Sequence, residues 1–185
     1  DEFIIIGAHF DHLGYGGPGS GSLKPDTSAI HNGANDNASG TAGLLELAHK
    51  LQLNRQLLKR SVLLIAFDAE EKGLLGSKYF IQNPTIAKNN IVTMINMDMI
   101  GKMQDSTLII GGVGTSPMFE PMLDSLSKDS GLKFEFNQAG YGPSDHASFY
   151  SENIPVLFFF TGDFENHYHL PEDDWQTINT QGERQ

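Results

Sequence analysis

The sequence predicts an α/β fold built on a parallel sheet, and three observations support this. Short, continuous apolar runs alternate with stretches whose apolar residues recur at helical spacing. Unbroken apolar runs are typical of strands that are buried on both faces, as in parallel sheets. Acidic residues or histidines follow several of the runs, directly or within a few residues, at the edge where open α/β sheets place their ligands. The runs are Phe3–Ala8, Val62–Ala66, Ile91–Met97 and Ile154–Phe160.

The composition is that of one ordinary globular domain. The 185 residues are enough for a full hydrophobic core, and 39% of them are hydrophobic while 19% are charged. The net charge of −11 argues against a nucleic-acid surface, because a phosphate backbone would be repelled. Since there is no cysteine, any metal site must use histidine and carboxylate ligands. No apolar run reaches the length of a membrane span.

The first predicted strand leads into a candidate metal ligand. His9 follows Phe3–Ala8, and Asp11 comes two residues later. A nearby carboxylate commonly accepts the second ring N–H of a metal-bound histidine. The alternative is a structural histidine that is hydrogen-bonded beneath a loop. The next segment, Leu13–Ser28, is rich in glycine and is predicted to be a long loop. Its glycines do not follow the strand–turn–helix pattern of a phosphate-binding loop, which argues against a nucleotide site.

A turn dense in asparagine, aspartate and glycine precedes the first predicted helix. We expect Ser39 or Asn37 to cap this helix, in which Leu44 and Leu51 keep helical spacing. Asp36 therefore lies just before a helix N-terminus. It is either a metal ligand or a further capping residue.

Acidic residues also follow the second and third predicted strands. Glu70 and Glu71 lie between the second strand and a helix predicted from about Gly73 to Gln82. Adjacent carboxylates repel, so they are tolerated best if a cation lies between them or if one holds a proton. The alternative is a solvated acidic turn that suits the helix dipole. Asp98 follows the third strand, and such an acid is costly to bury unless it is paired or metal-bound.

The C-terminal half is predicted to complete the sheet. Ile154–Phe160 is the most apolar strand and is therefore placed centrally. His169 lies in the polar segment that follows it. The other predicted elements are a short strand at Leu108–Ile110, a helix over Ser116–Ser130 closed by Gly131, an edge strand at Leu132–Phe136 and a short helix after a glycine-rich turn at Gly140.

These segments together bring two imidazoles and four carboxylates to what should be one rim of the sheet. A single metal ion needs only about three protein ligands. The set is therefore the one expected for a pair of zinc or zinc-like ions, with one carboxylate bridging and one left unbound as a base. Its members are His9, Asp36, Glu70, Glu71, Asp98 and His169.

Six motifs occur in the order GAHFDH, GANDNASG, FDAEEKGLLGS, NMDMIG, GYGPSDHASF and YHLPEDD. In this order the chain resembles the co-catalytic zinc aminopeptidase family, of the bacterial leucyl aminopeptidase and aminopeptidase Y type, from Phe3 to about Ile178. The resemblance implies a three-layer α/β/α sandwich around a central mixed, mostly parallel sheet. It also implies a single catalytic domain over residues 1–185 that is truncated at both ends, with room for a companion domain in the parent protein. A secreted, periplasmic or cell-envelope location is expected from the resemblance alone.

The resemblance implies two Zn²⁺ ions. His9 and Asp98 would bind the first ion, Glu71 and His169 would bind the second, and Asp36 would bridge both. The histidines that remain without a role are His12, His31 and His167.

The resemblance also implies hydrolysis of the first peptide bond of peptides with a free N-terminus. Glu70 would be the general base for a water held between the ions, a role worth about 10²–10⁴ in rate. Tyr141 would help to hold the substrate carbonyl oxygen. Asp11 would orient His9, Asp145 and His146 would support the site, and Met99 with nearby aromatic residues would line the pocket for the N-terminal side chain.

Three alternatives belong to related or inactive proteins. A glutaminyl cyclase uses one zinc ion, so the presence of both histidines and all four acids argues against it. An arginine-rich pocket for a substrate carboxylate would favour a glutamate carboxypeptidase-like enzyme. The three arginines lie away from the motifs, at Arg55, Arg60 and Arg184. A non-catalytic binding domain of the same fold should show ligand substitutions, and this chain shows none.

Overall fold

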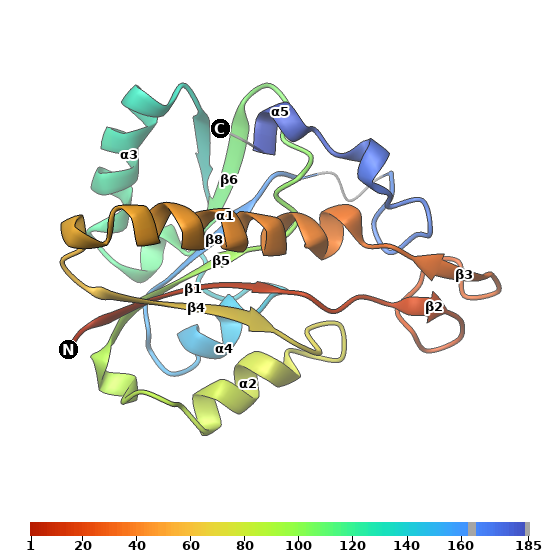
Figure 1. Ribbon diagram of the computed structural model, residues 1–185, viewed down its shortest axis with the longest axis horizontal. Coiled ribbons are helices and arrows are strands. Elements are labelled where there is room, and N and C mark those ends of the chain that lie inside the picture. The colour runs from red at the N-terminus through yellow and green to blue at the C-terminus, as the bar shows by residue number, and fades with distance from the viewer. Residues whose placement is uncertain (163–165, 184–185) are drawn as a thin grey trace.

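The computed structural model describes residues 1–162 and 166–183 (Figure 1). Its centre is a six-stranded sheet in the order β4–β1–β5–β8–β6–β7. The first four strands in this order run parallel, β6 is antiparallel to β8, and β7 is parallel to β6. The sheet is therefore mixed and mostly parallel, with β8 inside it and β7 at an edge, as predicted. The strands are β1 (Phe3–His9), β4 (Ser61–Phe67), β5 (Ile91–Met97), β6 (Thr107–Gly111), β7 (Lys133–Phe136) and β8 (Val156–Phe160).

Helices cover both faces of the sheet. Successive residues of a strand point to opposite faces. Ile5 of β1 packs in a cluster with Ile81 and Phe149, and its neighbour Ile6 packs with Leu44 on the other side. The three-layer prediction is thereby confirmed. The face of Ile6 carries α1 (Gly40–Leu53) and α3 (Phe119–Ser130), and the face of Ile5 carries α2 (Leu75–Gln82) and α4 (His146–Tyr150).

The remaining elements are short. They are a π-helical turn at Ala34–Ser39, 3₁₀ turns at Arg55–Leu57, Lys88–Asn90, Val113–Thr115 and Trp175–Thr177, and α5 (Thr180–Glu183). Among all helices in residues 1–162 and 166–183, none is long and apolar enough to cross a membrane.

The glycine-rich segment differs from its prediction as a plain loop. It contains β2 (Gly14–Gly16), which pairs antiparallel with β3 (Ser28–His31). This ribbon projects beyond the C-terminal ends of the parallel strands (Figure 1). Gly14 and Gly16 have φ values of 63° and 70°, which glycine adopts readily. These glycines allow the ribbon to pair although its sequence lacks the regular side-chain alternation of a strand.

Candidate metal centre

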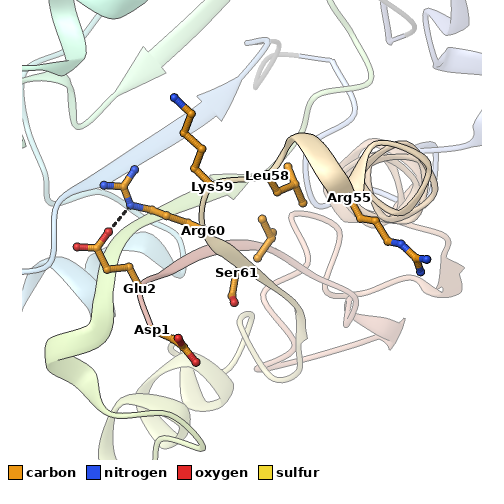
Figure 2. A pocket seen from close by; sticks show the side chains of 8 residues that line it. Asp1, Glu2, Arg55, Leu58, Lys59, Arg60 and Ser61 are labelled. Carbon is orange, nitrogen blue, oxygen red and sulfur yellow. Dashed lines mark hydrogen bonds and ion pairs between the residues drawn. The ribbon is translucent and has the colours of Figure 1, made fainter.

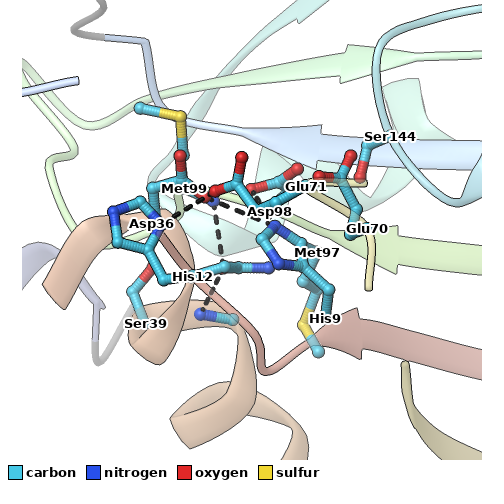
Figure 3. A network of polar contacts seen from close by, with 12 residues as sticks. His9, His12, Asp36, Ser39, Glu70, Glu71, Met97, Asp98, Met99 and Ser144 are labelled. Carbon is cyan, nitrogen blue, oxygen red and sulfur yellow. Dashed lines mark hydrogen bonds and ion pairs between the residues drawn. The ribbon is translucent and has the colours of Figure 1, made fainter. Parts of the chain in front are cut away.

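The six predicted residues converge at the C-terminal edge of the parallel strands. β1 ends at His9, which is its last residue rather than the first beyond it, and Asp98 directly follows β5. Glu70 and Glu71 lie in the turn after β4. Asp36 enters from the turn before α1, and Figure 3 shows its carboxylate among these side chains. His169 reaches the same place from the segment after β8.

The first group of possible ligands is His9, Asp36 and Asp98. His9 Nε2 lies 3.3 Å from Asp36 Oδ1 and 3.3 Å from Asp98 Oδ1. All three residues are buried, and their ligand atoms are close enough to share one ion. Asp98 Oδ1 has no hydrogen-bond partner within the part of the chain that the structure describes. A buried carboxylate oxygen without a donor is the environment that a cation would satisfy.

The second group shares Asp36 with the first. His169 Nε2 lies 3.3 Å from Asp36 Oδ2 and 3.2 Å from Glu71 Oε2. The two oxygens of Asp36 therefore face two different imidazoles, which is the arrangement that a bridging carboxylate requires. A third imidazole, His12, has a ligand atom within sharing distance of Asp36 and Glu71.

Asp11 supports the centre in a different way from the one expected. His9 Nδ1 donates to the backbone carbonyl of Asp11 at 3.1 Å, whereas it lies 3.6 Å from the Asp11 carboxylate. That carboxylate instead accepts the backbone N–H groups of Glu70 and Glu71, at 2.9 and 3.3 Å. Asp11 thus fixes the histidine tautomer with its main chain and anchors the Glu70–Glu71 turn with its side chain.

Asp173, which was not predicted to contribute, holds the turn that carries Asp36. Its Oδ2 accepts the backbone N–H groups of Asn35 and Asp36, both at 3.0 Å. Lys102 Nζ lies 3.4 Å from Asp173 Oδ1, and both side chains are buried. The available signal was the position of Asp173 in the same motif as His169.

Asn37 is the capping residue at the start of α1. Its Oδ1 accepts the N–H of Gly40 at 2.9 Å and also that of Met99 at 3.2 Å. Ser39, the other expected cap, donates to the carbonyl of Asn35 instead. Through Asn37 the turn before α1 is tied to the residue that follows Asp98.

The pKa shifts separate Glu70 from Asp36 and Glu71. Burial raises the pKa of Glu70 to about 8. Burial would also raise the pKa of Asp36 and of Glu71, but contacts with histidines lower both below their ordinary values. Among these three carboxyls, the two with a histidine partner are suited to bind a cation, and Glu70 is suited to exchange a proton.

A cavity opens beside the acids. It is lined by Asp36, Glu70 and Asp98, and by Met99 with aromatic residues. Tyr168 is among these residues, and its ring stacks on that of His169 with 3.8 Å between centroids. The remaining lining residues are Pro143, Phe158, Phe160 and His169.

The structure places Tyr141 outside the cavity, away from the position expected for its predicted role. Its side chain is 64% exposed and packs edge-on against Tyr150. It lines a separate hollow with Leu74 and Lys78. The turn that contains it presents Pro143 to the cavity instead. Tyr168 is the tyrosine that lines the cavity, and its position directly before His169 in the sequence was the missed signal.

Asp145 and His146 are buried at the start of α4. Neither carboxylate oxygen of Asp145 has a hydrogen-bond partner in the described residues, and burial raises its pKa to about 6. The ring of His146 stacks on Phe158 at 4.4 Å, and burial lowers its pKa to about 4. The supporting role of Asp145 stays a prediction.

Two arginines lie at the far end of the sheet. Arg55 and Arg60 line a hollow beside the start of β4 (Figure 2), and Arg60 Nε pairs with Glu2 Oε2 at 2.6 Å. The acids lie beyond the other end of β4. Arg184 lies outside the described residues. Neither Arg55 nor Arg60 is therefore placed to recognise a substrate carboxylate at the acid cluster, as the carboxypeptidase alternative would require.

The model of peptidase family M28 matches the sequence over residues 1–185. The chain belongs to peptidase family M28. It is 36% identical over 133 residues to leupeptin-inactivating enzyme 1 of Streptomyces exfoliatus, covering 70% of this chain and 29% of that protein. It is 29% identical over 194 residues to the aminopeptidase YwaD of Bacillus subtilis, covering 96% of this chain and 37% of that protein.

Solved structures of similar fold include the LapA aminopeptidase of Legionella pneumophila, with a TM-score of 0.79 and 27% identity. They also include BSAP, a zinc aminopeptidase of Bacillus subtilis, with a TM-score of 0.74 and 26% identity. The alignments cover 99% of this M28 chain, and 47% and 43% of those chains. The predicted family resemblance and fold class are confirmed, and the chain spans less than half the length of these four relatives.

Proposed function

We propose that this M28 chain carries the catalytic centre of a zinc-dependent aminopeptidase that hydrolyses the N-terminal peptide bond of peptides. The observation that carries the proposal is the carboxylate of Asp36, whose two oxygens each lie 3.3 Å from a different imidazole nitrogen. The names of the relatives, which include aminopeptidases and a zinc aminopeptidase, agree with it.

The donor set fits two zinc ions. Imidazole nitrogen and carboxylate oxygen are ordinary zinc ligands, and a catalytic zinc leaves a position open for water or substrate. His9 and Asp98 would hold one ion, Glu71 and His169 the other, and Asp36 both. Zinc bound in this way supplies Lewis acidity and activates water near neutral pH.

Glu70 transfers a proton from the attacking water to the leaving amine. It lines the cavity, and burial raises its pKa to about 8, so it can both take and release a proton near neutral pH. We assign it to accept the proton of the attacking water and to deliver that proton to the leaving amine. General acid–base catalysis of this kind contributes about 10²–10⁴ in rate.

Tyr168 takes the role first expected of Tyr141. Burial raises its pKa, so the phenol keeps its proton at neutral pH and can donate a hydrogen bond. Its place in the cavity wall next to His169 suits donation to the carbonyl oxygen that gains charge during attack.

The cavity favours peptides that begin with an apolar residue. The acids would attract a protonated N-terminal amine. Met99, Phe158 and Phe160 form an apolar wall beside them, which suits an aliphatic or aromatic side chain.

A direct test combines metal analysis with a substrate panel. The purified chain is assayed with p-nitroanilides of leucine, phenylalanine, lysine and glutamate, and with their N-acetylated forms, before and after chelation. We expect two zinc ions per chain and cleavage of the free-amine leucine and phenylalanine anilides, lost on chelation and restored by zinc. Cleavage of the N-acetylated compounds at similar rates, or turnover unchanged by chelation, would contradict the proposal.

A further inference from the structure

The segment of residues 12–31 has no role in the proposed reaction, yet it contacts two ligands of the centre. It contains the β2–β3 ribbon, which extends past the C-terminal ends of the strands (Figure 1). His12 at its start contacts Glu71, and Gly21 in its middle contacts His169. Both contacted residues belong to the second group of ligands.

His12 holds one oxygen of Glu71. The side chain of His12 is 8% exposed, and its Nδ1 lies 2.8 Å from Glu71 Oε1. An ionised carboxylate only accepts hydrogen bonds, so Nδ1 is the donor. The other oxygen of Glu71, Oε2, faces His169 Nε2 at 3.2 Å. The hydrogen bond from His12 therefore occupies Oε1 and leaves Oε2, which faces His169, for an ion.

The same segment orients the His169 imidazole. His169 Nδ1 donates to the carbonyl of Gly21 at 3.0 Å, so Nε2 is the nitrogen left to bind an ion. The N–H of Leu23 bonds to the carbonyl of His169 at 3.1 Å. Lys24 pairs with Glu172 in the same motif. Residues 12–31 are thus attached to the His169 segment at three places.

The ligands of the first ion are held from elsewhere. His9 Nδ1 bonds to the carbonyl of Asp11, and Thr41 Oγ1 donates to the carbonyl of His9. The backbone N–H of Asp98 bonds to Phe159 in β8. The contacts of residues 12–31 with the centre are therefore concentrated on the second ion.

We propose that His12 is a positioning residue for Glu71, and that residues 12–31 set the affinity of the second ion without setting that of the first. This inference rests on the proposed function, because it assumes the two-ion assignment. Supporting hydrogen bonds to metal ligands typically contribute about 10–100-fold to metal affinity. The geometry therefore predicts that removing the His12 hydrogen bond lowers the affinity for the second ion by this factor and leaves the affinity for the first ion unchanged.

The test is a stepwise titration of the chelator-treated full chain with Co²⁺ or Zn²⁺. Binding is measured by calorimetry and, for Co²⁺, by its visible absorption. His12→Leu removes the donor. His12→Asn places an amide N–H where Nδ1 lies, and His12→Gln places it farther out. His49→Leu, on the exposed side of α1, is the control.

We expect His12→Leu and His12→Gln to weaken the second ion by about 10–100-fold while the first stays within about threefold. His12→Asn should restore most of the loss, and the control should match the wild type. Far-UV circular dichroism of the metal-free variants shows whether each has folded. If His12→Leu does not fold, the comparison of Asn with Gln decides.

Equal second-ion affinity in the Asn and Gln variants would overturn the inference, as would equal weakening of both ions in a folded variant. A wild-type chain that binds fewer than two ions would instead overturn the proposed function. The two failures are therefore distinguishable.

Discussion

Asp173 holds Asp36 in place by accepting the backbone N–H of Asp36 at 3.0 Å through its buried carboxylate. Asp173 and His169 belong to the same short motif, so this part of the chain both supplies one ligand of the centre and anchors another. The other oxygen of Asp173 faces the buried Lys102, which makes the anchor a charged one.

Replacing Asp173 with Asn should therefore destabilise the protein. The variant removes the charge of the buried Asp173 carboxylate beside Lys102, and breaking a buried pair on one side typically costs about 3 kcal/mol or more in the free energy of unfolding. Urea denaturation of the metal-free protein measures this. Glu2→Gln, which breaks the exposed pair with Arg60, is the control and should barely move the midpoint. Equal urea midpoints for the two variants would show that the buried Asp173 carboxylate does not stabilise the fold.

Glu70→Gln should separate metal binding from turnover. The side chain keeps its size but can no longer take a proton, so we expect two ions per chain and a fall in kcat of about 10²–10⁴. Metal analysis and initial rates on leucine p-nitroanilide give both values. Turnover near that of the wild type would remove Glu70 from the role of base.

Asp36→Ala should remove both ions together, because its two oxygens serve the two groups of ligands. Metal analysis after dialysis against a buffered zinc concentration measures the effect. Asp124→Ala, on the exposed side of α3, is the control and should keep both ions. A variant that still binds two ions would show that Asp36 does not bridge.

The two tyrosines should differ in their effect on catalysis. Tyr168→Phe removes the hydroxyl from the cavity wall and should lower kcat by about 10-fold or more, by analogy with other donors to a developing oxyanion. Tyr141→Phe changes a side chain that is largely exposed outside the cavity and should stay within about twofold of the wild type, as surface changes usually do. Steady-state kinetics would contradict the assignment if the order were reversed.

His146 should make the metal-free fold sensitive to acid. In the folded chain its pKa is about 4, whereas an unfolded histidine takes a proton near 6.5. Between these values the unfolded state binds more protons, so the free energy of unfolding falls as the pH falls from 6.5 towards 4. His146→Leu should lessen the decline between pH 7.5 and pH 5 by about 2 kcal/mol. Urea midpoints at the two pH values test this, and parallel curves for the two proteins would contradict it.

Most of the sheet, and the convergence of the six candidate ligands at its edge, could be predicted because both depend on local patterns. Ile91–Met97 was predicted with its exact bounds, since this mostly apolar run is bounded by Asn90 and Asp98. His9, Glu71 and Asp98 follow such runs, and parallel strands bring their C-terminal ends to one edge of the sheet.

The errors lie where long-range packing decides. The position of Tyr141 outside the cavity could not be predicted, because the conformation of a glycine-rich turn determines whether Tyr141 or Pro143 meets the cavity. Asp173 and His12 act through partners that are far away in the sequence, and nothing local distinguishes them from surface residues. The β2–β3 ribbon was missed because glycine obscures the strand pattern.

The second group of ligands is complete only at His169, whereas the first is complete at Asp98. On the proposed assignment, a chain emerging from the ribosome has made every donor of one ion long before it makes the last donor of the other. The second ion can be captured only after residue 169 has been synthesised. Metal stoichiometry would then report whether a molecule has been made and assembled at least as far as the YHLPEDD motif.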